Sequence, residues 1–180
     1  MRSYKTEGIV IRRRNFGEAD RLVTIFSKKH GKIQVKAVGV RKINSRRSSH
    51  IELLNYSTFN LYKGRSMSLL TEVSNIEDFS EIKEDLIKTG FAYHICELVD
   101  GLCAENQENE EIFYLLQKTL KRLSLENDIA AIVREFEIEL LTKLGFYKQS
   151  DITQNLNTSV FIEQILERKL KSKQILPRFT

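Results

Sequence analysis

Apolar and polar residues follow two different periods along the 180-residue chain. Up to about residue 75, the apolar residues form short runs that are bounded by charged or glycine-containing turns. Such runs, rich in Val, Ile, Phe and Tyr, are typical of antiparallel strands. Five short strands favour a small closed barrel, and we predict an OB-fold. The strands are expected at residues 6–14, 22–27, 32–38, 53–62 and 67–73.

Alternation within the first strand predicts a charged outer surface. Ile9 and Ile11 share one face of the strand. The other face is then expected to carry Val10, Arg12 and Arg14, so two arginines point toward solvent.

After residue 78 the apolar residues recur at helical spacing. The first helix is expected to begin at Ser80, which is a suitable N-cap, and Gly145 is placed where a glycine ends the third helix. The fourth helix is expected to end in a cationic turn that complements its dipole. The four expected helices cover residues 80–102, 112–125, 129–144 and 160–171.

Charge is divided unevenly between the two halves of the chain. Residues 1–80 hold 16 Lys and Arg against 7 Asp and Glu, whereas residues 81–180 hold 13 against 17. A polyanion is the expected partner of the basic half. We therefore predict an α+β protein with a five-stranded OB-fold barrel in residues 1–79 that binds nucleic acid. An all-helical domain in residues 80–180 is expected to bind proteins and, in part, DNA.

Basic residues concentrate in the first 50 positions, which carry 14 Lys and Arg and only 3 acidic residues. Exposed charges add little to stability and like charges repel, so folding gives no reason for such a cluster, whereas phosphate binding does. A solvated surface without a ligand is the alternative. The candidate DNA-binding residues are Arg12, Arg14, Lys36, Arg41, Lys42, Arg46 and Arg47.

Three aromatic side chains are candidates for stacking on bases, as in OB-folds that bind single strands. Phe16 lies in the first turn, and Tyr56 and Tyr62 fall on the polar face of the fourth strand. Packing in the core is an equally good explanation for each of them.

Catalytic and metal sites find little support in the sequence. It has no nucleophile elbow with a Ser-His-Asp order and no phosphate-binding glycine loop. The histidines are isolated, and Cys96 and Cys103 are followed by no further ligand at zinc spacing. We expect two buried thiols, no enzyme activity, no catalytic residue, no cofactor and no metal.

Localisation signals are absent as well. The chain has no run of about 18 apolar residues, so no membrane span or membrane partner is expected. Its first 14 residues lack the apolar region of a signal peptide. We expect a cytoplasmic, nucleoid-associated protein that is a monomer when free.

Several motifs resemble those of the bacterial recombination mediator RecO. The N-terminal domain of that family is resembled by residues 8–14 (GIVIRRR), 17–24 (GEADRLVT), 30–32 (HGK) and 37–41 (AVGVR), followed by Ser45-Arg46. Its central helix and C-terminal motif are resembled by residues 133–137 (VREFE), 144–146 (LGF) and 170–176 (LKSKQIL). The motifs occur in the family's order and span nearly the whole chain.

The resemblance implies an N-terminal OB-fold followed by a helical domain. It implies binding of single- and double-stranded DNA and annealing of complementary strands. It also implies action with RecR to load the recombinase RecA onto strands coated by single-stranded-DNA-binding protein, whose acidic C-terminal tail docks on the helical domain. Carried over, Arg41, Lys42 and Arg46 would contact DNA. Arg134 would be a candidate for binding the tail, and a surface arginine without a ligand is an equal alternative.

One stretch departs from the family pattern. Many members carry a four-cysteine zinc module after the Leu-Gly-aromatic element. Here residues 148–158 occupy that place and contain no cysteine. We therefore expect a short form without zinc and with a reduced helical domain.

Two other functions fit the same residues. An RNA-binding OB module would carry a similar basic surface with few aromatic residues. A scaffold protein that binds an acidic partner through its basic face would do so as well.

Overall fold

The computed structural model describes residues 2–148 and 157–176. These residues cluster into two compact units. The barrel unit contains the residues up to Phe79 together with Ala104–Phe113. The helical unit contains Ser80–Cys103 and the residues from Tyr114 onward. Relative to the domains expected from the sequence, the segment Ala104–Phe113 groups with the barrel.

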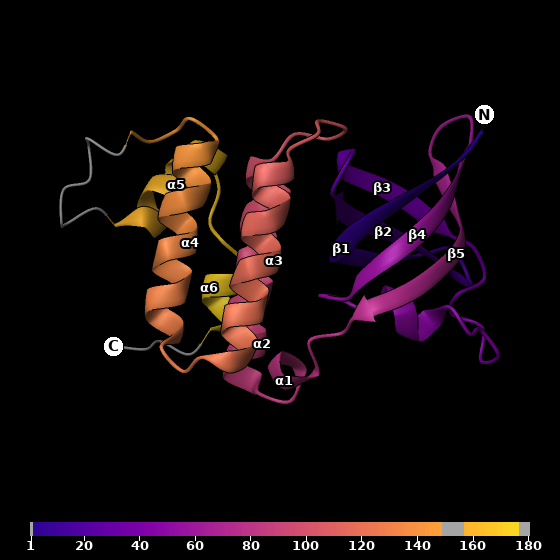
Figure 1. Cartoon of the computed structure of the whole chain (residues 1–180), viewed down its shortest axis with the longest axis horizontal. Helices are drawn as coiled ribbons and strands as arrows, with labels where there is room; N and C mark the ends of the chain where they lie inside the picture. Colours follow the sequence, from indigo (N-terminus) through magenta and orange to yellow (C-terminus); the bar gives the residue numbers. More distant parts are fainter. Residues whose placement is uncertain (1, 149–156, 177–180) are drawn as a thin grey trace. The chain divides into compact units, whose positions relative to one another are not determined.

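The five strands of the barrel unit close on themselves in the order β1-β2-β3-β5-β4 (Figure 1). Neighbours are antiparallel except β3 and β5, which pair in parallel through Val35–Ser68 and Lys36–Leu69. This barrel followed by helices confirms the predicted α+β class and its OB-fold. The strands are β1 (Ser3–Phe16), β2 (Asp20–Ser27), β3 (Gly31–Ala37), β4 (Tyr56–Lys63) and β5 (Ser68–Glu77).

A β-bulge at Ile11 corrects the alternation expected along β1. Val10 pairs with Ile25 but Arg12 pairs with Thr24, so one extra residue stands on β1 between them. The extra residue reverses which side chains point outward. Val10 therefore belongs to the barrel core, while Arg12 is exposed as expected.

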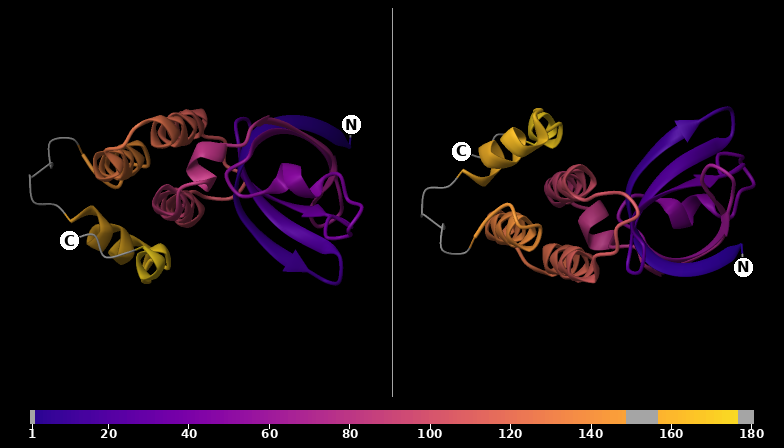
Figure 2. Two further views of the ribbon diagram at one scale, coloured as in Figure 1. Left: turned by 90° about the horizontal axis from the view of Figure 1, so that it is seen from below. Right: turned by 90° about the horizontal axis from the view of Figure 1, so that it is seen from above.

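The loop after β3 closes one opening of the barrel. Figure 2 looks into the barrel, and a short 3₁₀ turn at Ser48–Ile51 lies across it. Ile51 is fully buried and joins the barrel core. The side chains of this core come from every strand and are Val10, Val23, Ile25, Ile33, Val35, Ala37, Val40, Ile51, Phe59, Leu61 and Leu70.

The segment Ala104–Phe113 packs directly on the barrel. Gly31 has a positive φ of 63°, and a Cβ at this position would lie 1.8 Å from the carbonyl oxygen of Gln107. Next to it, the backbone N–H of Asn106 donates to the carbonyl of Lys32 at 2.8 Å. Only glycine allows this close approach of two backbones.

The second unit is helical, as predicted. Glu110–Phe113, the start of α3, group with the barrel, and α2 contacts α1, α4 and α6. None of the described helices combines the length and the apolar character that a membrane span requires. The helices are α1 (Ser80–Lys83), α2 (Leu86–Leu102), α3 (Glu110–Leu125), α4 (Ile129–Lys143), α5 (Thr158–Leu166) and α6 (Ser172–Ile175).

Two helix boundaries differ from those expected. Ser80 begins only the short α1, because Asp85 accepts hydrogen bonds from the backbone N–H groups of Ile87 and Lys88 and caps a new helix, α2. The helix α5 stops before Glu167, which takes a left-handed conformation with a φ of 52°. The cationic residues expected in its last turn therefore follow the helix.

A buried hydrogen-bonded network joins α2, α4, α5 and α6. His94 contacts the Ser172 hydroxyl through Nδ1 at 2.8 Å and the Glu137 carboxylate through Nε2 at 2.7 Å. The second carboxylate oxygen of Glu137 accepts a hydrogen bond from the Thr158 hydroxyl. All four side chains are buried, so the network holds helices together rather than presenting a nucleophile.

A second carboxylate holds the segment between α5 and α6. Glu97 accepts hydrogen bonds from the Arg168 guanidinium at 2.7 Å and from the backbone N–H groups of Lys171 and Ser172 at 2.9 and 2.8 Å. Burial alone would raise the pKa of Glu97, but these hydrogen bonds outweigh it and lower the pKa to about 2.

The depressed pKa of Glu97 gives a pH-dependent prediction. The carboxylate stabilises the folded state above its ordinary pKa of 4.5, and this contribution disappears as the pH falls from 4.5 toward about 2. At neutral pH, Glu97→Gln is expected to be less stable than the parent by about 1 kcal/mol, a value reduced by solvent screening at Arg168. The difference should shrink as the pH approaches 2. Urea midpoints measured by circular dichroism across this range test it, and a constant difference would contradict it.

Candidate nucleic-acid interface

Two loops at one end of the barrel are tied together by hydrogen bonds. The β1–β2 turn at residues 17–19 meets the loop at residues 38–47, which follows β3. The backbone N–H of Arg41 donates to the carbonyl of Ala19 at 2.9 Å, and its guanidinium donates to the carbonyl of Gly17 at 3.1 Å. The backbone N–H of Gly39 donates to the Asp20 carboxylate at 2.8 Å. The two loops therefore form one surface.

The predicted DNA-binding residues lie in these loops or on the strands beside them. Strand register aligns Arg14 with Leu22 and Leu22 with Lys36. Arg14 and Lys36 thus stand two strands apart on the outer surface, a separation of about 10 Å. Together these residues form the basic rim, which consists of Arg12, Arg14, Lys36, Arg41, Lys42, Arg46 and Arg47.

An ionised carboxylate organises one side of the basic rim. The Lys36 ammonium lies 3.0 Å from the Asp20 carboxylate and 5.0 Å from the centroid of the Phe16 ring. The hydrogen bond from the Gly39 backbone lowers the pKa of Asp20, and the hydrogen bond and charge of Lys36 and the charge of Lys42 act in the same direction. Asp20 therefore stays charged and fixes both Lys36 and the loop after β3.

Three cations of the basic rim are available to a ligand. Arg14, Lys42 and Arg46 are exposed. Within the described parts of the chain, their side chains make no hydrogen bond or ion pair. No acidic side chain lies within ion-pair distance of them in the described parts of the chain, so they can bind phosphates.

Arg47 has a structural role that the sequence did not indicate. Its guanidinium donates to the carbonyl of Val38 at 2.8 Å and to that of Leu70 at 3.0 Å. These bonds fix the loop to its own start at Val38 and to Leu70 of strand β5. The expectation that folding gives no reason for cations in this loop is therefore wrong for Arg47, and also for Arg41, which anchors the β1–β2 turn.

The three aromatic candidates also differ in how far they are exposed to a ligand. Phe16 is 46% exposed, and Tyr62 is partly buried and accepts a hydrogen bond from Arg2 at 3.3 Å. Stacking on bases stays a prediction for both. Tyr56 does not lie on a polar surface as expected, because it is only 9% exposed. The segment Ala104–Phe113 covers it: the Tyr56 ring meets the ring of Phe113 edge-on at 5.9 Å.

Sequence reasoning missed one acidic residue of this end of the barrel. Glu52 lies 2.5 Å from Arg13 and 3.5 Å from Arg21. It neutralises two arginines that are not part of the basic rim. No local pattern indicates this pairing, because Glu52 is 39 positions from Arg13 in the sequence.

The candidate tail-binding residue lies in the helical unit. Arg134 is exposed on α4, and its neighbour Glu135 forms an ion pair of 2.5 Å with Arg122 of α3. The surface of α3 has a shallow groove of about 530 Å³ that Arg122 helps to line. Tyr114 and Leu125 provide apolar surface there, with 47% and 73% of each exposed. The remaining groove residues are Gln117, Lys118, Lys121 and Glu126.

The cysteines are buried free thiols, as predicted. Burial, with a smaller effect from the charge of Asp100, raises the pKa of Cys96 to about 12, so this thiol stays protonated. Within residues 2–148 and 157–176, no cluster of His, Cys, Asp or Glu is suited to hold a metal ion. Most of the stretch where the sequence departs from the zinc-module pattern, residues 149–156, lies outside the described residues.

A closed five-stranded OB-fold barrel with a basic rim, joined in one chain to a helical unit, is typical of the class of proteins that bind oligonucleotides. Comparison with known proteins identifies the family within this class. Residues 1–79 match the family described as Recombination protein O N terminal, and residues 83–151 match Recombination protein O C terminal. The chain belongs to the RecO family.

Curated relatives carry the same name. The DNA repair protein RecO of Roseiflexus sp. (strain RS-1) is 41% identical over 148 residues, which are 82% of this chain and 52% of the relative. The DNA repair protein RecO of Acetivibrio thermocellus is 40% identical over 147 residues, or 81% and 59% of the two chains. That of Desulforamulus reducens is 35% identical over 170 residues, or 94% and 64%. The chain thus spans between half and two thirds of the length of these relatives.

Proposed function

We propose that this chain is a DNA repair and recombination mediator. It binds single- and double-stranded DNA, anneals complementary strands and helps to load a recombinase onto strands coated by single-stranded-DNA-binding protein. The observation that carries the proposal is the basic rim, where Arg14, Lys42 and Arg46 have no bonding partner among the described residues. The proposed role makes and breaks no covalent bond and needs no cofactor or metal.

The annealing step follows from charge neutralisation. The phosphates of two complementary strands repel each other as the strands approach. Cations on the barrel surface neutralise phosphates of both strands and release their counterions, which favours association at low salt. The loop at residues 38–47 presents Lys42 and Arg46 toward solvent, and β1 presents Arg14. Base pairing then proceeds without assistance from a catalytic group.

The helical unit is proposed to bind protein partners, RecR and the acidic tail of the single-stranded-DNA-binding protein. Arg134 supplies a cation for the tail carboxylates. The groove on α3 supports this assignment, because Lys118 and Lys121 flank the apolar surface of Tyr114 and Leu125. Joining a DNA-binding unit to a tail-binding unit in one chain raises its local concentration on coated strands in the cytoplasm and nucleoid.

Annealing of coated strands tests the proposed function. Two complementary oligonucleotides are coated with the cognate single-stranded-DNA-binding protein and mixed with and without this chain at low and high salt. We expect annealing to accelerate by about tenfold or more at low salt and much less at high salt. Absence of acceleration on strands that the chain binds when bare would reject the mediator function, and tighter binding of structured RNA in the same assay would identify an RNA-binding module instead.

A further inference from the structure

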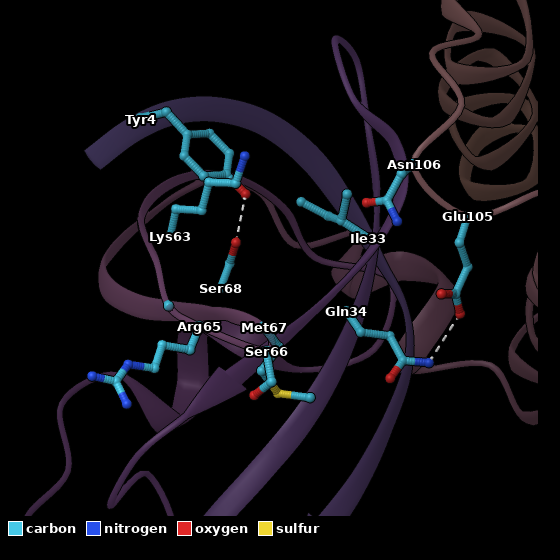
Figure 3. A pocket seen from close by; sticks show the side chains of 11 residues that line it. Tyr4, Ile33, Gln34, Lys63, Arg65, Ser66, Met67, Ser68, Glu105 and Asn106 are labelled. Carbon is cyan, nitrogen blue, oxygen red and sulfur yellow. Dashed lines mark hydrogen bonds between the residues drawn. The ribbon is translucent and has the colours of Figure 1, made fainter. Parts of the chain in front are cut away.

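The barrel unit has a second polar site, away from the loops of the basic rim. A pocket of about 310 Å³ opens between β3, the β4–β5 turn and residues 105–106 (Figure 3). An adjoining lobe of about 400 Å³ shares Tyr4, Ile33, Lys63, Ser68 and Asn106 with it. A site of this size is at the lower end of the range of small-ligand pockets.

The pocket lies where the barrel is least tightly paired. The strands β3 and β5 share only the pairs Val35–Ser68 and Lys36–Leu69, at the later part of β3. The earlier part of β3 does not pair with β5, and the pocket lies beside this unpaired part. Residues of the segment Ala104–Phe113 complete its wall, since Glu105 bridges to Lys32.

The walls of the pocket present one aromatic ring and several hydrogen-bonding groups. The Tyr4 hydroxyl and the Ser68 hydroxyl are 2.8 Å apart on one side. On the other side, the Gln34 amide donates to the Glu105 carboxylate at 3.2 Å. Arg65 extends outward from the β4–β5 turn, and Lys63 stands at the start of that turn. Two cations, two hydroxyl groups, an amide and the exposed carboxylate of Glu105 thus line one pocket.

We propose that this pocket binds one unstacked base of a single DNA strand. The proposal rests on the proposed function, because the basic rim holds phosphates further along the same strand. Gln34 of the pocket and Lys36 of the rim point outward from the same strand, two residues apart, at a spacing of about 7 Å. A strand that leaves the rim along β3 therefore reaches the pocket directly.

The chemistry of the lining favours a base over an acidic peptide. The carboxylate of Glu105, which lines the pocket, repels peptide carboxylates but accepts hydrogen bonds from the exocyclic amino groups of cytosine and adenine. The amide of Gln34 can pair with adenine in a similar way. Lys63 and Arg65 at the mouth attract the phosphates beside the inserted base. The lining thus predicts a preference for cytosine and adenine over thymine.

The pocket also separates single strands from duplexes. A base must leave its stack and its partner to enter, which costs a few kcal/mol in a duplex and much less in a single strand. The basic rim binds phosphates of either form. The pocket therefore holds a single strand in place while its neighbouring bases remain open for pairing.

Photocrosslinking of the full chain tests the inference. A single strand with one 5-iododeoxycytidine is bound and irradiated, and the adducts are mapped by mass spectrometry. We expect adducts at Tyr4 or Met67. In parallel, Arg65→Ala, which changes an exposed side chain of the turn, should weaken single-strand binding by about fivefold and duplex binding by less than twofold. Lys148→Ala in the helical unit is the control of equal charge.

The possible results distinguish the inference from the proposed function. Tight binding with adducts only in the loops at residues 17–19 and 38–47 would overturn the pocket and leave the DNA-binding function intact. Equal loss of single-strand and duplex binding in Arg65→Ala would also overturn it. If an acidic peptide added before irradiation prevents formation of the pocket adduct, a peptide replaces the base as the occupant. No binding of any DNA by the parent chain would reject the proposed function itself.

Discussion

Replacing Glu137 with alanine is expected to lower the free energy of unfolding of the helical unit by about 3 kcal/mol. The carboxylate is buried and bonds to His94 and to Thr158. Its removal leaves a ring nitrogen and a hydroxyl without partners in the interior, and each such group costs about 1–3 kcal/mol. The lost side chain also leaves a cavity between α4 and its neighbours.

Urea unfolding followed by far-ultraviolet circular dichroism measures this loss. The matched control is Glu135→Ala on the same helix. The Glu135 side chain is 54% exposed, and it pairs with Arg122, whose side chain is 30% exposed. Its effect should be a small fraction of that of Glu137→Ala, because exposed ion pairs contribute little. The double variant His94→Ala with Glu137→Ala should lose much less than the sum of the single losses, since both remove the same contact. A loss below about 1 kcal/mol for Glu137→Ala would show that water satisfies the network.

The network illustrates what the sequence pattern could not predict. His94 is isolated from other histidines and ligating residues along the chain, and its two partners are 43 and 78 positions away. Periodicity reports which face of a helix is buried, but not which polar residue of another helix meets it there. A buried histidine, glutamate and serine look like exceptions to their helical patterns until the helices are packed together.

The barrel was predictable because its signals are local. In β3, Ile33, Val35 and Ala37 alternate with Gln34 and Lys36, and the structure places the first three in the core. Short runs of this kind, with glycine-containing turns between them, leave few architectures other than a small barrel.

The departures come from contacts between distant segments. Tyr56 is covered by a segment that begins almost 50 residues later in the chain. The alternation of polar and apolar residues within β4 gives no information about that segment. On β1, the bulge at Ile11 reverses the side on which Val10 lies. A bulge is one extra residue, and the apolar run itself gives no sign of it because Ile9, Val10 and Ile11 are all apolar.

The sequence predicts that the candidate interface is basic, but it does not predict which basic residues bind DNA and which hold the loop in place. Composition identifies the loop at residues 41–47 as basic, which is sufficient to expect a polyanion. It does not separate Arg47, which bonds two backbone carbonyls, from Arg46, which bonds none among the described residues. This distinction decides which substitutions report on DNA and which report on the loop.

The triple variant Arg14→Ala, Lys42→Ala and Arg46→Ala is therefore the sharpest test of the basic rim. At low salt it is expected to bind single-stranded DNA between about 10-fold and 100-fold more weakly than the parent. Each lost phosphate contact on a single strand reduces the slope of log K against log salt by about 0.7, so three lost contacts should make the slope shallower by about 2. Fluorescence anisotropy with a labelled oligonucleotide at four or more salt concentrations measures both quantities. The losses should be similar for strands of different sequence, because phosphates carry no sequence information.

The control variant removes the same charge elsewhere. Lys118→Ala, Lys121→Ala and Lys148→Ala change three exposed lysines of the helical unit and leave the basic rim intact. If net charge alone attracts DNA, both triple variants weaken binding equally, and the rim is not a site. Local contacts instead predict that only the rim variant changes the salt slope. Its unfolding midpoint should match that of the parent, because the three side chains hold no other described residue, whereas Arg47→Ala should lower the midpoint by releasing the loop from Val38 and Leu70. The stability of the protein and its affinity for DNA therefore depend on different arginines of the same loop. Arg47 holds the loop on the barrel, and this leaves Arg46 available to bind phosphates.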